Sequence, residues 1–152
     1  MKLDEALAGV KRVFLETAPV IYFVEENPDF VEVVQVVIDQ LIAGEIEAVI
    51  SPVTFAECLV QPIKMKDIKL QEDFVDFLLA GEPIFMVDTD TEIGYEAAHL
   101  RAKYNLKLPD ALQVATAIRS GCEALLTNDD QFRRVSELRV LMVENFVEGD
   151  VS

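Results

Sequence analysis

The sequence contains no tryptophan, a single histidine, His99, and only two cysteines, Cys58 and Cys122. Neither cysteine has a second cysteine or a histidine at metal-ligand spacing, so we expect two free buried thiols rather than a disulfide or a metal site. A chain of 152 residues buries enough surface to fold without cross-links. His99 lies off the apolar face of its predicted helix, and we expect it to be exposed, with no role as ligand or base.

Long apolar runs are also missing from the chain. No segment approaches the roughly 18 apolar residues of a membrane span. Residues 1–12 are charged and lack the continuous apolar core of a secretory signal. We therefore expect a protein of the reducing cytoplasm that does not associate with membranes.

Basic residues are few, since 13 lysines and arginines stand against 28 acidic residues and give a formal net charge of −15. Such a charge repels polyanions and disfavours non-specific binding to nucleic acid. A site that concentrates carboxylates would instead attract divalent cations and basic partner segments. The one dense lysine group, Lys64, Lys66 and Lys69, is interpreted as a solvated linker rather than an RNA-facing patch.

Predicted strands alternate with predicted helices along the chain. Short apolar runs predict strands over residues 12–15, 48–50, 84–87, 124–126 and 139–143. Apolar residues at helical spacing predict helices over residues 19–24, 29–44, 52–62, 70–80 and 91–104, and from residue 109 onward. This alternation calls for an α/β fold, a three-layer α/β/α sandwich with a mostly parallel central sheet. We expect one domain over residues 1–152, with residues 1–11 as a lead-in and residues 145–152 as a frayed acidic tail.

Acidic residues follow the ends of several predicted strands. Glu16 and Asp129 come directly after buried strands, and Glu57 lies one helical turn beyond another. Asp110 opens the helix that begins at Pro109. In an open α/β sheet, ligands bind outside the carboxyl ends of the strands. We therefore propose that Glu16, Glu57, Asp110 and Asp129, here called the four acids, form one site.

Each of the four acids also has a purely structural interpretation as a helix cap or a helix-start charge. Capping does not explain why the acids stand at the ends of separate elements, so we favour a shared site. Asp130 is a candidate fifth acid. Thr127 is interpreted either as a residue that orients a carboxylate or water, or as a buried threonine satisfied by backbone.

The chemistry of such a site follows from its composition. Carboxylates held close together repel one another and raise one another's pKa unless a cation neutralises them. Oxygen ligands without cysteine or histidine favour Mg²⁺ or Mn²⁺. These ions lower the pKa of an attacking water and stabilise the leaving oxygen in phosphodiester hydrolysis, and no protein nucleophile is required.

Four segments of the chain resemble the four acidic motifs of PIN domains, and most closely those of VapC-like toxins. They are FLETAPVIY at residues 14–22, SPVTFAE at residues 51–57, LPDALQVA at residues 108–115 and LTNDDQF at residues 126–132. The resemblance covers nearly the whole chain in the family's order. It implies a parallel sheet in the order 3-2-1-4-5, a Mg²⁺- or Mn²⁺-dependent endoribonuclease acting on an RNA substrate, a homodimer, and a cognate antitoxin protein whose tail occupies the acidic groove.

Within that resemblance, Glu16, Asp110 and Asp129 are expected to be metal ligands and Glu57 a ligand or a water-orienting base. The family usually has aspartate where this chain has Glu16, and many members have a polar residue at the position of Ala18. An added methylene displaces a metal by about an ångström, which can cost on the order of 10²-fold in rate. Two alternatives stay open: a weakened PIN domain that acts by binding RNA or an antitoxin, and a phosphotransfer or phosphatase domain, which would need an aspartate nucleophile at the position of Glu16.

Overall fold

A single parallel sheet forms the centre of the computed structural model, which describes residues 1–148. Its strands are β1 (Arg12–Leu15), β2 (Glu47–Ile50), β3 (Ile84–Met86), β4 (Ala124–Thr127) and β5 (Arg139–Met142). They pair in the order β3-β2-β1-β4-β5, and every pairing is parallel. The predicted sheet order is therefore confirmed. Leu15 is in register with Leu126, so β1 and β4 end side by side.

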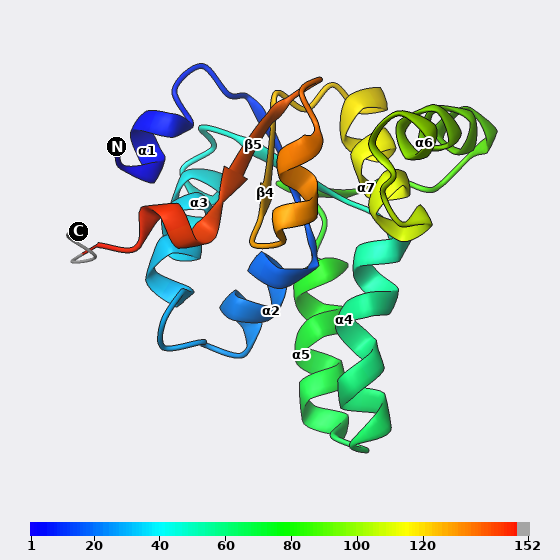
Figure 1. The fold of residues 1–152 in the computed structure, drawn as a ribbon. Coiled ribbons are helices and arrows are strands. Elements are labelled where there is room, and N and C mark those ends of the chain that lie inside the picture. Colours follow the sequence, from blue (N-terminus) through cyan, green and yellow to red (C-terminus); the bar gives the residue numbers. More distant parts are fainter. Residues whose placement is uncertain (149–152) are drawn as a thin grey trace.

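The sheet is buried on both faces because each central strand alternates between two apolar cores. Val13 and Leu15 of β1 belong to one core, and Phe14 between them belongs to the other. The first core also includes residues of α1 (Leu3–Ala6), α2 (Thr17–Val24), α3 (Val31–Ile42) and α5 (Ile68–Leu78). The second includes residues of α6 (Thr91–Tyr104) and α7 (Leu108–Arg119). These layers form the predicted α/β/α sandwich (Figure 1).

Helix α4 (Pro52–Lys64) and helix α5 form a hairpin that projects away from the sheet (Figure 1). Ser51 caps α4 through a hydrogen bond from the backbone N–H of Thr54 at 3.4 Å. The expected end of this helix at Pro62 is wrong, because Pro62 is buried and lies inside the helix. Its carbonyl accepts hydrogen bonds from Asp67 and Gln71, and these contacts hold the last turn against α5.

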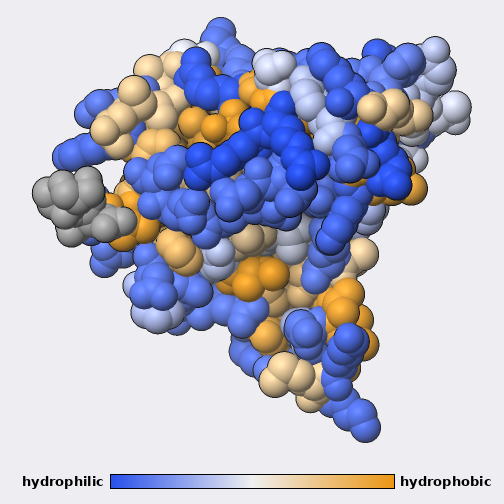
Figure 2. All heavy atoms as spheres, in the orientation of Figure 1, coloured by the Kyte–Doolittle hydropathy of each residue, from blue (hydrophilic) through white to orange (hydrophobic). Residues whose placement is uncertain are grey.

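The hairpin also changes the interpretation of the lysine group. Lys64 ends α4, Lys66 lies in the turn, and Lys69 belongs to α5 and pairs with Asp73. These lysines are exposed, but they surround a tight turn and do not form a linker. Exposed apolar side chains share this end of the hairpin, and Figure 2 shows apolar groups over it on an otherwise mostly hydrophilic face.

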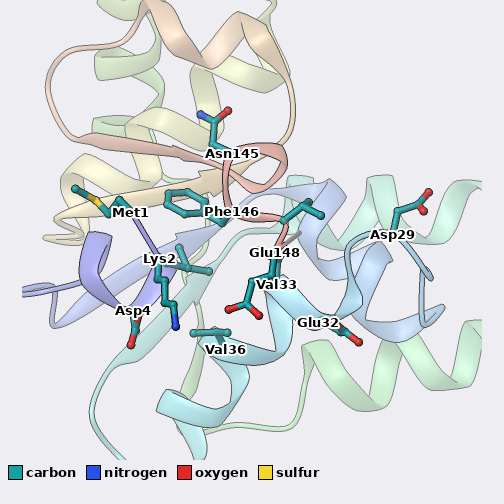
Figure 3. A pocket seen from close by; sticks show the side chains of 12 residues that line it. Met1, Lys2, Asp4, Asp29, Glu32, Val33, Val36, Asn145, Phe146 and Glu148 are labelled. Carbon is teal, nitrogen blue, oxygen red and sulfur yellow. The ribbon is translucent and has the colours of Figure 1, made fainter. Parts of the chain in front are cut away.

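The last described segment is ordered against the first core, which corrects the expected tail. Val143–Phe146 forms a 3-10 helix, η2, and both Phe146 and Val147 pack against the first core. The expected frayed segment therefore does not begin at residue 145, and residues 149–152 lie outside the described residues. Segments of α1, α3 and η2 surround a pocket of about 510 Å³, and none of the four acids lines it (Figure 3). None of the helices within residues 1–148 has the length and apolar character needed to cross a bilayer.

Candidate active site

Glu16 lies at the point where β1 ends and α2 begins. The register of the two central strands places it beside Thr127, and the Thr127 hydroxyl donates a hydrogen bond of 2.7 Å to Glu16 Oε1. Both residues are buried, with 7% of Glu16 exposed. Burial raises the pKa of the Glu16 carboxyl, the hydrogen bonds from Thr127 and Thr17 oppose that rise, and the negative charge of Glu57 adds to it. The environment of Glu16 therefore favours a nearby cation or a bound proton.

Glu57 projects from α4 and is held by donors from two other helices. Thr17 of α2 donates from its hydroxyl to Glu57 Oε1 at 2.8 Å. Gln113 of α7 donates from Nε2 to the same oxygen at 3.1 Å. The Gln113 amide is itself held by the hydroxyl of Thr54, which donates to Gln113 Oε1 at 3.0 Å. Donors from α2 and α7 thus fix one oxygen of Glu57.

Asp110 lies half-buried in the first turn of α7. Burial is the largest cause that raises its pKa from 3.8 to about 6, and the negative charges of Asp129, Glu16 and Glu57 add to the rise. The positive charge of Lys107 opposes it. Asp110 therefore lies near enough to Asp129, Glu16 and Glu57 for their charges to act on it.

Asp129 has two roles at the end of β4. Its Oδ1 accepts a hydrogen bond of 2.9 Å from the backbone N–H of Gln131, so the capping interpretation is correct for the 3-10 helix η1 (Asp130–Arg134). Its own backbone N–H donates to the Thr127 hydroxyl at 3.0 Å, which ties it to the site. Capping and membership of the acidic site are therefore compatible.

Asp130 and Thr127 are the two predicted supporting residues, and of these two only Thr127 is hydrogen-bonded to any of the four acids. Asp130 is exposed and pairs with Arg133, whose Nε lies 2.8 Å from Asp130 Oδ1. Thr127 links Glu16 to Asp129 through one hydroxyl, as donor to the first and acceptor from the second. The interpretation of Thr127 as a residue that orients a carboxylate fits these contacts.

Asn128 is a supporting residue that the sequence interpretation missed. Its amide nitrogen donates to the hydroxyl of Tyr22 at 3.0 Å, and its amide oxygen accepts from the backbone N–H of Glu144 at 3.0 Å. These bonds tie the loop that carries Asp129 to α2 and η2. Asparagine is common in turns, so the presence of an asparagine between a strand and a helix cap did not indicate a supporting role.

The two cysteines are free and buried, as expected. Burial is the largest cause that raises the pKa of Cys58 to about 12, and the negative charges of Glu16, Glu57 and Glu25 add to it. Burial likewise raises the pKa of Cys122 to about 12. A thiol with so high a pKa is a poor nucleophile and a poor metal ligand. His99 is exposed on α6, where its ring stacks edge-on against Tyr95.

The donor chemistry of the four acids fits a hard divalent cation, because it consists of carboxylates that repel one another. Within residues 1–148, no three Asp, Glu, His or Cys side chains are grouped closely enough to surround an ion as they stand. The carboxyls of Glu16, Glu57 and Asp129 each accept hydrogen bonds, and Asp110 is half-buried. Ion binding would therefore require side chains of the four acids to move closer together.

The model of the PIN domain family matches residues 13–138. The chain belongs to the PIN domain family. All four acids lie within the matched residues, whereas α1 and η2 lie outside them. A search of the curated proteins found no match.

Solved structures similar to this PIN domain include several toxin–antitoxin proteins. VapBC2 from Rickettsia felis, bound to a DNA fragment from its promoter, has 20% identity and a TM-score of 0.70, covering 86% of this chain and 98% of that one. VapC20 from Mycobacterium tuberculosis, a toxin that cleaves the sarcin-ricin loop, has 12% identity and a TM-score of 0.65, with 84% and 98% covered. DNA-bound VapBC from Salmonella typhimurium has 16% identity and a TM-score of 0.63, with 88% and 98% covered. At these identities the likeness establishes the fold.

Proposed function

We propose that this PIN domain is a Mg²⁺- or Mn²⁺-dependent endoribonuclease and the toxin of a toxin–antitoxin pair. The observation that carries the proposal is the half-buried position of Asp110 near three other acids: burial is the largest cause that raises its pKa to about 6, and the charges of Asp129, Glu16 and Glu57 add to the rise. A protein gains no stability from such repulsion, and sites with strongly shifted pKa values are frequently functional. Membership of the PIN family and structural similarity to VapC proteins support the choice of reaction and biological role.

In this proposal Glu16, Asp110 and Asp129 bind the ion. When bound, such an ion would activate a water and would stabilise the charge that develops on the leaving oxygen. Thr127 keeps the Glu16 carboxylate oriented through its 2.7 Å hydrogen bond. Lys107 lies close enough to affect Asp110 and provides a positive charge for an approaching phosphate.

Glu57 serves as a ligand or as the base that orients water. Within residues 1–148 its Oε1 holds both hydrogen bonds, from Thr17 and Gln113, and Oε2 has no donor. Oε2 is therefore available to accept the proton of the attacking water. The water oxygen forms a bond to phosphorus, the bond to the leaving ribose oxygen breaks, and solvent protonates that oxygen.

Cleavage of structured RNA by the purified protein in Mn²⁺ tests the proposed reaction. Wild-type protein should cleave, EDTA should stop cleavage, and Asp110→Asn should reduce the rate at least 10²-fold. Asp76→Asn is the matched control, because it removes one negative charge from exposed α5 and should leave the rate unchanged. Cleavage that persists unchanged in Asp110→Asn would contradict the assignment.

We also propose that the protein binds a cognate antitoxin through a basic segment of that partner. We further propose that the protein is a homodimer and acts in the cytoplasm. The net charge of −15 and the coupled acids favour a basic partner segment. Light scattering of the purified chain tests the dimer. Titration with a lysine- and arginine-rich peptide tests the charge argument, and tight binding should weaken in Asp110→Asn.

A weakened PIN domain that acts by binding is the second candidate function. The observation that favours it is Glu16, whose longer side chain is committed to Thr127 where the family usually has aspartate. Calorimetric titration with Mn²⁺ separates the two functions. Absent Mn²⁺ binding together with tight partner binding would favour the second.

A further inference from the structure

Helix α7 contains a buried glutamine whose neighbours in the sequence are apolar. Gln113 is 0% exposed, as are Ala111, Val114 and Ala115 of the same helix. Burial of an amide costs free energy unless both its ends are hydrogen-bonded. Gln113 satisfies this condition through Thr54 at 3.0 Å and Glu57 at 3.1 Å. The amide therefore connects a buried hydroxyl of α4 to a carboxylate at the edge of the site.

The orientation of the Gln113 amide follows from the chemistry of its partners. An ionised carboxylate only accepts hydrogen bonds, so the amide nitrogen must face Glu57 and the amide oxygen must face Thr54. The Thr54 hydroxyl can then donate to that oxygen. A flipped amide would place its oxygen against the Glu57 carboxylate and would lose the hydrogen bond to it. The Glu57 carboxylate thus selects the amide orientation, and the buried hydroxyl of Thr54 holds the other end of the amide in place.

The hydrogen bonds to Glu57 also distinguish its two oxygens. Gln113 of α7 and Thr17 of α2 both donate to Oε1, at 3.1 and 2.8 Å. Glu57 is exposed, so without these donors its carboxyl group would rotate freely in solvent. With Oε1 held from two sides, Oε2 points in one direction and stays free of protein donors within residues 1–148.

We propose that Gln113 is a positioning residue that, together with Thr54, fixes Glu57 so that Oε2 is presented to the ion or the attacking water. This inference rests on the proposed metal-dependent nuclease function and deepens it. Residues that orient the ligands of a metal typically change metal affinity or activity by about 10- to 100-fold when they are replaced. A glutamine that merely filled the core would change stability alone.

Gln113→Met tests the proposal, because methionine nearly preserves the volume and removes both hydrogen bonds. The matched control is Thr116→Val, which removes a buried hydroxyl from the next turn of α7, where it donates to the carbonyl of Leu112 and touches none of the four acids. Both variants should lower the thermal unfolding midpoint. Only Gln113→Met should also have a functional effect of about tenfold or more. That effect is either a loss of Mn²⁺ affinity, measured by calorimetry on metal-stripped protein, or a loss of kcat at saturating Mn²⁺ with KM for RNA unchanged.

Two further comparisons test whether Gln113 acts through Glu57. In a Glu57→Gln background, Gln113→Met should have no further effect on Mn²⁺ affinity or kcat, because the group that it positions has already changed. Thr54→Val should weaken Mn²⁺ binding in the same direction, and Thr54→Ser, which keeps the hydroxyl, should restore it. The threonine pair decides the question even if Gln113→Met does not fold.

Each outcome distinguishes this inference from the proposed function. If Gln113→Met and Thr54→Val match Thr116→Val within twofold in both Mn²⁺ affinity and kcat, the positioning role is overturned and the nuclease function stands. An effect of equal size in the Glu57→Gln background also overturns it. If wild-type protein binds Mn²⁺ without cleaving RNA, the nuclease function fails and the affinity measurements still decide the role of Gln113. Wild-type protein that binds no Mn²⁺ overturns both.

Discussion

Asp110→Asn should stabilise the metal-free protein while it removes activity. The ionised Asp110 carboxylate is repelled by Asp129, Glu16 and Glu57 and is half removed from water. Asparagine has nearly the same shape and carries no charge, so the substitution relieves both costs. A residue that destabilises its own fold in the absence of metal is expected of a cation-binding site.

The magnitude follows from the pKa of Asp110, which is raised from 3.8 to about 6. At about 1.4 kcal/mol per pKa unit, ionisation at neutral pH costs the folded state roughly 3 kcal/mol. Asp110 is only half-buried, and solvent screening reduces the cost to about 1 to 1.5 kcal/mol. For a domain of this size, that free energy raises the unfolding midpoint by roughly 3 to 5 °C.

The pH dependence has a definite sign. Below pH 3.8, Asp110 is protonated in the folded and unfolded states alike and costs nothing. Between pH 3.8 and about 6, the folded state holds the proton more tightly, so the stability of metal-free wild-type protein falls as pH rises. The advantage of Asp110→Asn should therefore be full at pH 7.5 and about half as large at pH 5.

Thermal unfolding in EDTA at these two pH values is the assay, with Asp76→Asn as the control for loss of one charge. Saturating Mn²⁺ should reverse the order, since ion at 100 times its dissociation constant adds about 2.7 kcal/mol to wild-type protein alone. If Asp110→Asn is no more stable than Asp76→Asn in EDTA at pH 7.5, the four acids are not coupled and the reasoning is refuted.

Three other substitutions or measurements follow from the structure. Thr127→Val removes one hydrogen-bond donor from the buried carboxylate of Glu16 and should cost about 1 to 3 kcal/mol in denaturant unfolding; an unchanged midpoint would argue against that hydrogen bond. Cys58 and Cys122 should not react with a thiol reagent at pH 8 in native protein, because their pKa values are about 12, and both should react after unfolding. Phe74→Ala should cost about 3 to 5 kcal/mol, because this α5 residue is fully buried in the first core, and a cost below 1 kcal/mol would contradict that packing.

The strands could be predicted because each contains a short apolar run, whereas their order followed from the resemblance to PIN domains. The predicted strand at residues 12–15 coincides with β1, and the predicted helix at residues 91–104 coincides with α6, whose first turn Asp90 caps. Pro62 was misleading because a proline near a helix end removes only one backbone hydrogen bond, and packing against α5 outweighs that loss. The η2 helix was missed because Phe146 and Val147 stand among acidic residues, and their burial depends on α1 and α3.

The four acids could be proposed from their places at strand ends and helix starts, whereas the side chains that support them could not be identified. Sequence spacing placed Gln113 on a different side of its helix from Leu112 and Ile118, but it did not reveal that this side is buried against α4. That burial depends on how α4 and α7 pack, with Thr54 and Glu57 one turn apart on the facing helix. A glutamine among buried alanines and valines is the signal that could have identified it.

Diffraction from crystals soaked in Mn²⁺ tests the central claim most directly, because the anomalous signal locates the ion without reference to activity. The account predicts one strong peak at about 2.1 Å from carboxylate oxygens of Glu16, Asp110 and Asp129. A peak bound only to other acids, or no peak near these three at saturating Mn²⁺, would contradict it.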